Sequence, residues 1–215
     1  MSSIIRSRAR AVACRIAALT CIGVLAATGA ASATNSVAAY FAACPGQSLS
    51  TPFSQWGDTS NYFLLPGGSF EGTADQVGWT LSGGASLTTG NEPFYVGRSS
   101  DSQSLSVPAG GTATSPYFCV DNTMPDLRFL AQEASAGSDL QVTALVQTST
   151  GVSAVSLADL ADGSMSEWAP TQPITGDTGS LPDGTKLEVA LQFSAPGASG
   201  SWEIDDVYVD PYRSG

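Results

Sequence analysis

Apolar and polar side chains alternate along Ser201-Trp-Glu-Ile-Asp-Asp-Val-Tyr-Val209, near the end of the 215-residue chain. Leu140-Gln-Val-Thr-Ala-Leu-Val-Gln147 and Leu187-Glu-Val-Ala-Leu-Gln-Phe193 follow the same rule. A period of two sends alternate side chains to opposite faces of a strand, so each run is typical of a β-strand with one buried face. These three segments belong to the clearest predicted strands of the chain, Leu140–Thr148, Lys186–Phe193 and Ser201–Val209.

Shorter alternating runs lie between them, separated by turn sequences such as Gly110-Gly111 and Pro182-Asp183-Gly184. Long helices have no place to begin, and only Val155 to Asp162 has a spacing compatible with a short helical turn. About ten strands without a long helix predict an all-β fold, a two-sheet antiparallel β-sandwich, with a jelly roll favoured over an immunoglobulin-like arrangement. The other expected strands are Tyr62–Leu65, Trp79–Leu81, Ala85–Thr88, Leu105–Val107, Thr114–Val120, Leu127–Gln132 and Val152–Leu157. The expected core between the sheets contains Phe70, Trp79, Leu145, Val189, Leu191, Trp202 and Ile204.

The N-terminal segment has the three parts of a secretory signal peptide. Four arginines between residues 6 and 15 precede an apolar stretch from Ile16 to Ala30, which is followed by Ala31-Ser32-Ala33. The stretch is shorter than the roughly 20 apolar residues that a spanning helix needs. We therefore expect a signal peptide over residues 1–33, with a lipoprotein anchor at Cys21 as the alternative. The protein is then expected to be secreted or extracellular, free or attached to the cell surface, with no membrane span after signal removal.

Two cysteines, Cys44 and Cys119, follow the predicted cleavage site. In an oxidising compartment two cysteines most simply form one disulfide. It would close a loop of about 75 residues, for which chain entropy gives a stabilisation of about 4 kcal/mol. We expect residues 34–52 to be an N-terminal leader tied down by this disulfide, and residues 53–215 to be the β-sandwich domain.

The charge of the chain excludes several classes of function. It has 8 basic and 19 acidic residues, no histidine and a net charge of −11. Without histidine there is no Ser-His-Asp or Cys-His catalysis and no His-ligated metal. The few isolated basic residues argue against a nucleic-acid partner. Glycoside hydrolysis needs only two carboxylates, but nothing singles out one pair among nineteen, so we expect no catalytic activity.

Two segments near opposite ends of the chain carry a family resemblance. They are Pro66-Gly-Gly-Ser-Phe-Glu71-Gly72, followed by Gly78-Trp79, and Trp202-Glu-Ile-Asp205-Asp206-Val207. Together they resemble the galactose-binding-like jelly roll, and more narrowly the carbohydrate-binding modules of families 4 and 9. In those modules a Gly-x-Phe-Glu near the first strand and an aromatic-x-x-Asp-Asp-Val in the last strand recur.

The resemblance implies a structural calcium ion on Glu71 and on Asp205 or Asp206. Calcium prefers oxygen ligands, which carboxylates and backbone carbonyls supply without histidine or cysteine. Strand alternation sends Asp205 and Asp206 to opposite faces, so we favour Asp205 as the ligand. Such an ion would join the first strand to the last and stabilise the fold away from any ligand site. The alternative is that all three residues are solvated surface acids.

Binding of a glycan would use aromatic side chains, because sugar rings stack their apolar faces on them while polar groups bind the hydroxyls. The segment Asn91–Arg98 is the strongest candidate, since it gathers asparagine, glutamate, tyrosine and arginine within eight residues. The candidate carbohydrate-binding residues are Trp56, Asn91, Glu92, Tyr95, Arg98 and Tyr117.

The sequence thus predicts a secreted, non-catalytic β-sandwich that binds a glycan or another extracellular surface. The alternative is a structural or adhesive cell-envelope protein of the same fold, without a small-ligand pocket. A surface cleft lined by exposed aromatic side chains would favour the first of these functions.

Overall fold

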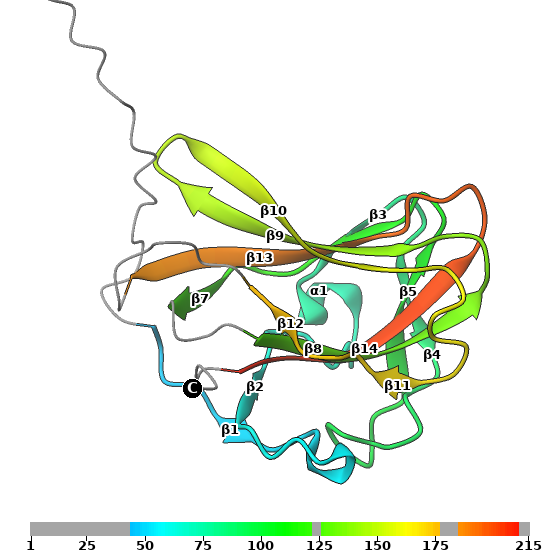
Figure 1. Cartoon of the computed structure of the whole chain (residues 1–215), viewed down its shortest axis with the longest axis horizontal. Helices are drawn as coiled ribbons and strands as arrows, with labels where there is room; N and C mark the ends of the chain where they lie inside the picture. The colour runs from blue at the N-terminus through cyan, green and yellow to red at the C-terminus, as the bar shows by residue number, and fades with distance from the viewer. Residues whose placement is uncertain (1–43, 122–125, 177–184, 211–215) are drawn as a thin grey trace, which may run out of the picture. The chain divides into compact units, whose positions relative to one another are not determined.

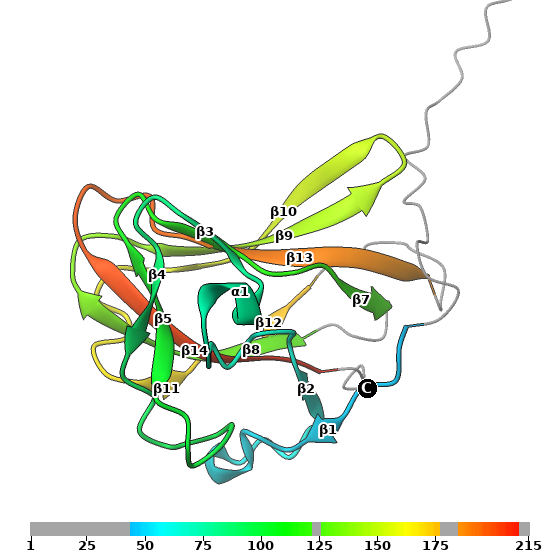
Figure 2. The same ribbon diagram turned by 180° about the vertical axis from the view of Figure 1, so that it is seen from behind.

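The computed structural model describes residues 44–121, 126–176 and 185–210. The predicted signal peptide and the first part of the predicted leader lie outside these residues. Two antiparallel sheets form two layers with the core between them (Figures 1 and 2), which confirms the predicted two-sheet antiparallel β-sandwich.

Within the described residues the first sheet has eight strands, and β14 is its central element. Along one edge β14 pairs with β8, which also carries the two short strands β11 and β12. Along the other edge it pairs first with β5 and then with β2. The strands of this sheet are β1 (Leu49–Ser50), β2 (Tyr62–Leu64), β4 (Ser86–Thr89), β5 (Gln103–Pro108), β8 (Asp126–Ser135), β11 (Ala169–Pro170), β12 (Ile174–Thr175) and β14 (Ser201–Asp210).

The second sheet has six strands, in the order β10-β9-β13-β6-β3, with β7 also paired to β13. The predicted helical turn within Val155–Asp162 is wrong, because β10 remains paired with β9 as far as Leu160. The predicted strand Thr114–Val120 is two strands, since Pro116 has no N–H to donate to a ladder. The strands are β3 (Thr80–Ser82), β6 (Thr112–Thr114), β7 (Phe118–Asp121), β9 (Leu140–Thr148), β10 (Gly151–Leu160) and β13 (Lys186–Ser194).

Helical structure in the described residues is limited to two short segments. Helix α1 (Ala74–Val77) begins at Thr73, which forms a capping box with Gln76. A single 3₁₀ turn, η1, covers Ser54–Trp56. No helix of the described part of the chain has the length and apolar character needed to cross a membrane.

The core lies between the sheets and is rich in aromatic side chains. Trp202 of β14 is fully buried, and its indole N–H donates to the Ser138 carbonyl at 2.7 Å. Trp79 stacks on Phe193 with ring centroids 5.7 Å apart. All predicted core residues are buried except Leu145, which is half-buried. That prediction is wrong because Val142 and its even-numbered neighbours occupy the inward face of β9.

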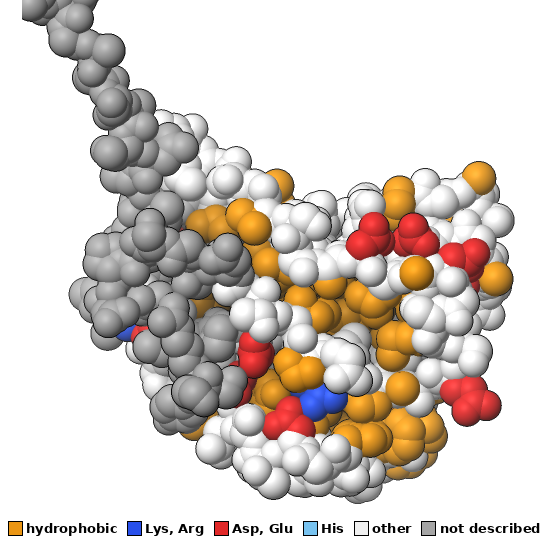
Figure 3. Space-filling view, in the orientation of Figure 1, with side chains coloured by type: hydrophobic (Ala, Val, Ile, Leu, Met, Phe, Trp, Pro, Cys, Tyr) orange, Lys and Arg blue, Asp and Glu red, His pale blue; other side chains and the backbone are white. Residues whose placement is uncertain are grey.

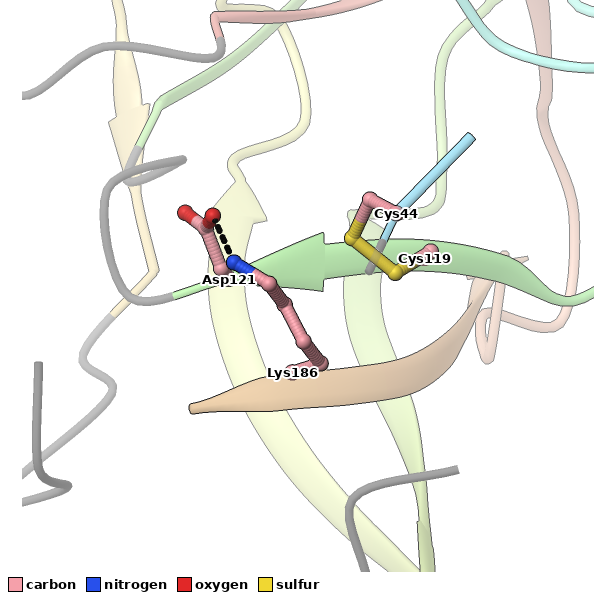
Figure 4. The surroundings of a disulfide bond; sticks show 4 residues. All are labelled: Cys44, Cys119, Asp121 and Lys186. Atoms are coloured by element: carbon pink, nitrogen blue, oxygen red, sulfur yellow. Dashed lines mark hydrogen bonds and ion pairs between the residues drawn. A yellow bond between two sulfur atoms is a disulfide. The ribbon is translucent and has the colours of Figure 1, made fainter. Parts of the chain in front are cut away.

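The predicted disulfide is confirmed: Cys44 is bonded to Cys119 of β7, with Cα atoms 5.3 Å apart (Figure 4). Close by, Lys186 Nζ of β13 lies 2.6 Å from Asp121 Oδ2 of β7. The segment that begins at Cys44 is thus bonded to the second sheet, whereas β1, a few residues later, pairs with β2 of the first sheet. The disulfide therefore contributes a covalent connection between the two layers.

Candidate functional site

A β-bulge in the middle of β14 forms the base of the candidate site. Ser201–Ile204 pair with β5 and Tyr208–Val209 with β2, so Asp205–Val207 lie between these two pairings. On the opposite edge the register with β8 shifts between Asp205 and Tyr208, and Asp206 has a φ of 49°. A bulge re-aims side chains. The predicted alternation of Asp205 and Asp206 is therefore wrong here: both are 1% exposed and both reach the same loop.

That loop runs from Asn91 to Asp101 and is held by carboxylates. Glu92 is fully buried, and its carboxylate accepts hydrogen bonds from the N–H groups of Phe94 and Val96, both at 2.5 Å. The N–H of Glu92 donates to Asp205 Oδ2 at 3.4 Å. Glu92, predicted to contact a glycan, is thus an internal support of the loop.

Gly97 is the point at which the loop meets β14. Its N–H donates to Asp206 Oδ2 at 2.8 Å. A Cβ atom at this position would lie 2.7 Å from both Asp101 Oδ2 and Asp206 Oδ1, so only glycine fits without displacing a carboxylate. Those two oxygens are buried and accept no hydrogen bond from the described residues. Two unsatisfied carboxylate oxygens therefore converge beside Gly97.

Burial makes the charged forms of these acids costly. It raises the pKa of Asp205 to about 9, with a further contribution from the neighbouring Asp206 carboxylate. Burial also raises the pKa of Asp206 to about 7, although the hydrogen bond from Gly97 acts in the opposite direction. The pKa of Asp101 is raised by burial as well. The negative charge of these three aspartates therefore has to be removed by protonation or compensated by a bound cation.

Glu71 lies next to this pair but is already engaged. Its Oε1 accepts hydrogen bonds from the N–H groups of Ser102 and Gln103, at 2.6 and 2.7 Å. It thereby fastens the segment after Asp101 and adds negative charge that raises the pKa of Asp101 and Asp206. Asp205 is similarly engaged, because its Oδ1 accepts from the N–H of Asp206 at 2.8 Å.

The arrangement fits a hard cation in part. Asp101 and Asp206 offer free oxygens, the ligand type that calcium prefers. Within the described ranges, no three acidic, histidine or cysteine side chains form a ready-made metal-binding group. Backbone carbonyls or water would have to complete the six to eight oxygens of a calcium shell. Asp101 was not foreseen from the sequence, where it stands alone among serines.

The outer face of the same loop carries exposed aromatic rings. Phe94 is 39% and Tyr95 is 52% exposed, and Tyr95 has a φ of 51°, a left-handed conformation uncommon for a bulky residue. Trp56 of η1 contacts Phe94 edge to face, with ring centroids 4.9 Å apart. We call Trp56, Phe94 and Tyr95 the aromatic platform. Segments near residues 56 and 95 thus meet at one surface.

A second, smaller core supports the platform. Phe53, Tyr62, Leu130 and Tyr208 form it, and Trp56 packs against it. The Arg128 guanidinium lies 4.4 Å above the Phe53 ring and forms an ion pair of 2.5 Å with Asp58 Oδ2.

The Tyr62 hydroxyl donates to the same Asp58 oxygen at 2.7 Å. Burial raises the pKa of Asp58, but the hydrogen bonds from Tyr62, Ser60 and Arg128 outweigh it and hold the pKa below its usual value. The support is therefore partly apolar packing and partly an ionic network.

The other predicted carbohydrate-binding residues, Asn91, Arg98 and Tyr117, are not part of the aromatic platform. Asn91 donates from its side-chain amide to the Glu92 carbonyl, and Arg98 is exposed. Tyr117 is exposed but lies between β6 and β7 of the second sheet, and among the described residues its ring does not contact the platform. On the face shown in Figure 3, hydrophobic side chains gather over the middle, in the region that lies between β10 and β11 in Figure 1.

Comparison with known proteins does not show a family for this chain. No family model matches the sequence, and neither does any curated protein. Similar solved structures include carbohydrate-binding modules. One is the family 22 xylan-binding domain of a Paenibacillus barcinonensis xylanase, 17% identical with a TM-score of 0.45, covering 68% of this chain and 93% of that one. Similar structures thus include modules of families 22 and 11, whereas the sequence motifs resemble those of families 4 and 9.

Two other structures come from larger proteins. The chain spans only 28% of a Clostridium thermocellum xylanase comprising such a module and a catalytic module, at 16% identity, a TM-score of 0.46 and 68% coverage of this chain. A cleaved adhesin domain of Lys-gingipain is 15% identical with a TM-score of 0.43, covering 69% of this chain and 98% of that domain. Likeness at these identities and TM-scores carries no argument about function, which has to be argued from this chain's own residues.

Proposed function

We propose that this protein is a secreted, non-catalytic β-sandwich that binds a glycan through the aromatic platform. One observation carries the proposal: two segments distant in sequence bring the half-buried ring of Trp56 against the exposed ring of Phe94, next to the exposed Tyr95, on a supported surface. Sugar rings present apolar C–H faces that stack on such rings, and the burial of that apolar area favours binding.

Internal hydrogen bonds of the loop strengthen this proposal. Phe94 and Val96, on either side of Tyr95, are each held by the buried Glu92 carboxylate. Tyr95 keeps an unusual left-handed backbone conformation, and such conformations are often maintained at ligand-binding sites. A surface fixed before binding loses less entropy when the ligand arrives.

Charge indicates which glycans fit. With a net charge of −11 the chain repels polyanions, so a neutral polysaccharide is favoured over an acidic one. Gln55, next to Trp56, and Arg98, close to Tyr95, are exposed polar side chains that can bind hydroxyl groups.

Binding to neutral polysaccharides tests the proposal directly. Pull-down and affinity electrophoresis would use xylan, cellulose, chitin and mixed-linkage β-glucan with the protein produced without residues 1–33. We expect Trp56→Ala and Tyr95→Ala each to weaken binding about tenfold or more, since stacking on one ring contributes on the order of 1–2 kcal/mol. Leu64→Ala, which removes a similarly exposed apolar side chain of β2, is the control and should bind as wild type. Binding that survives both aromatic substitutions would contradict the proposal.

A structural or adhesive role without a small-ligand pocket is the second candidate. It is favoured by the β9–β10 hairpin, whose strand β10 lies at the end of its sheet and exposes Val152 and Val155. A protein surface could pair with such an edge. If this function is the correct one, Val155→Lys should abolish attachment to cells while the platform variants leave it unchanged.

We also propose that the protein binds calcium, with Asp101 and Asp206 supplying free carboxylate oxygens and Glu71 adding negative charge. Asp205, favoured by the sequence, is less suitable because both its oxygens already accept hydrogen bonds. The ion would add positive charge where the buried acids lack compensation.

A further inference from the structure

The loop from Asn91 to Asp101 has two different faces. Its outer face carries Phe94 and Tyr95, two of the three platform residues. Its inner face meets the carboxylates of β14: Glu92 N–H bonds to Asp205 and Gly97 N–H bonds to Asp206. Gly97 lies only two residues beyond Tyr95 in the chain. A shift of Gly97 relative to Asp206 would therefore also move Tyr95, because only one residue lies between Gly97 and Tyr95.

The attachment of this loop to β14 depends on groups that repel one another. Asp101, at the end of the loop, is 8% exposed, and Asp206, in the bulge, is 1% exposed. Both present an unpartnered oxygen to the space beside Gly97. Two buried like charges at such proximity push the loop away from the strand, whereas a cation between them pulls the two together. The same two side chains can thus loosen or fasten the loop.

We propose that a divalent cation, with calcium favoured by the oxygen-only ligands, binds between Asp101 and Asp206 and orders the loop that carries the aromatic platform. The cation thereby controls ligand binding as well as stability. This differs from the expectation that a metal would act away from the ligand site. The part that concerns the glycan rests on the proposed function, whereas the ordering of the loop does not.

Loop order can be measured without a glycan. Hydrogen exchange of the amides of Phe94, Val96 and Gly97 would be followed in 2 mM calcium chloride and in EDTA. We expect exchange to slow about tenfold or more in calcium for wild type, and acrylamide quenching of the tryptophan fluorescence, to which Trp56 contributes, to decrease. Asp101→Asn keeps the shape of the side chain but removes its charge, and should lose the calcium response.

Two further variants make the test specific. Asp75→Asn removes an exposed acid of α1 and should keep the full response. Gly97→Ala retains both carboxylates but places a methyl group 2.7 Å from their free oxygens, so it should block the cation without removing a charge. It also serves if Asp101→Asn fails to fold. Equal exchange in calcium and EDTA for the wild type, or an undiminished response in a folded Gly97→Ala protein, would overturn the proposal.

The glycan is added in a second step. On the best polysaccharide from the binding screen, we expect the affinity of wild type to fall about tenfold in EDTA, and that of Gly97→Ala to be the same with and without calcium. If the loop responds to calcium but no polysaccharide binds, the proposed function fails and the ordering of the loop stands. If polysaccharide binds equally in calcium and EDTA, the control of binding fails and the proposed function stands.

Discussion

Strands β14 and β10 are both ten residues long, yet they reverse the usual relation between charge and burial. β14 is central in its sheet, and it buries three aspartates, Asp205, Asp206 and Asp210. β10 is at the end of its sheet, where it exposes valines and carries one acid, Asp159. Buried acids need partners and exposed apolar residues need none. Burying the aspartates of β14 costs free energy, and a bound ligand of positive charge would compensate that cost.

The largest expected effect is a loss of stability, because side chains of β14 are buried in the core whereas Val152 of β10 is exposed. Trp202→Ala in β14 should lower the free energy of unfolding by about 3–5 kcal/mol, because it leaves a cavity in the core and an unpaired Ser138 carbonyl. Val152→Ala in β10 should change it by less than about 0.5 kcal/mol, since this side chain is 53% exposed. Urea denaturation measures the free energy of unfolding of both variants. Equal losses would contradict the assignment of Trp202 to the core and of Val152 to the surface.

A smaller effect concerns calcium, which should act on β14 and not on β10. A cation at a hundredfold excess over its Kd contributes about 2.7 kcal/mol to a folded state that alone binds it. For a domain of this size that corresponds to a rise in Tm of roughly 5–10 °C. Differential scanning fluorimetry should show the rise in wild type and in Val152→Ala, with reversal by EDTA.

The variants Asp101→Asn and Glu71→Ala should lose most of this rise, because they remove negative charge around Gly97. An identical Tm of wild type in calcium and in EDTA would leave the buried acids of β14 without a metal partner. Their charge would then be neutralised by protons alone.

The smallest effect is at Asp58, whose pKa is lowered where those of the β14 acids are raised. Because the unfolded chain binds this proton more readily than the folded protein, the Asp58–Arg128 pair stabilises above the unfolded pKa of about 3.9. That contribution, about 1 kcal/mol, is lost as pH falls through the lower pKa of the folded protein. Urea melts at pH 7 and pH 3 should show Asp58→Asn to be less stable than wild type at pH 7, with a smaller difference between the two proteins at pH 3. A constant difference between the two proteins would exclude ionisation of Asp58 as its cause.

Regular parts of the fold could be predicted from the sequence because alternation records burial directly. β9 begins and ends at Leu140 and Thr148 as predicted, and β14 exceeds its predicted range by one residue. Helix α1 was not predicted, although Thr73 and Gln76 have the spacing of a capping box.

The candidate site was harder to predict because it depends on an irregularity. Asp206 contacts Gly97 only because of the bulge, and the sequence of β14 contains no pattern that predicts this bulge. The importance of Asp101 arises from a strand that lies more than a hundred residues later in the chain. Trp56 and Tyr95 were recognised individually, whereas the contact between Trp56 and Phe94 is a product of tertiary structure.

The disulfide also determines how this domain would carry mechanical load. A pull on the chain at Cys44 enters the second sheet through Cys119, where β7 pairs with β13 over four residues. β1 has only two residues in its ladder and would peel first if it carried that force alone. The covalent bond shifts the force to the longer ladder and leaves β1 unloaded. Reduction would therefore remove the covalent path and leave the two-residue ladder of β1 to carry the force.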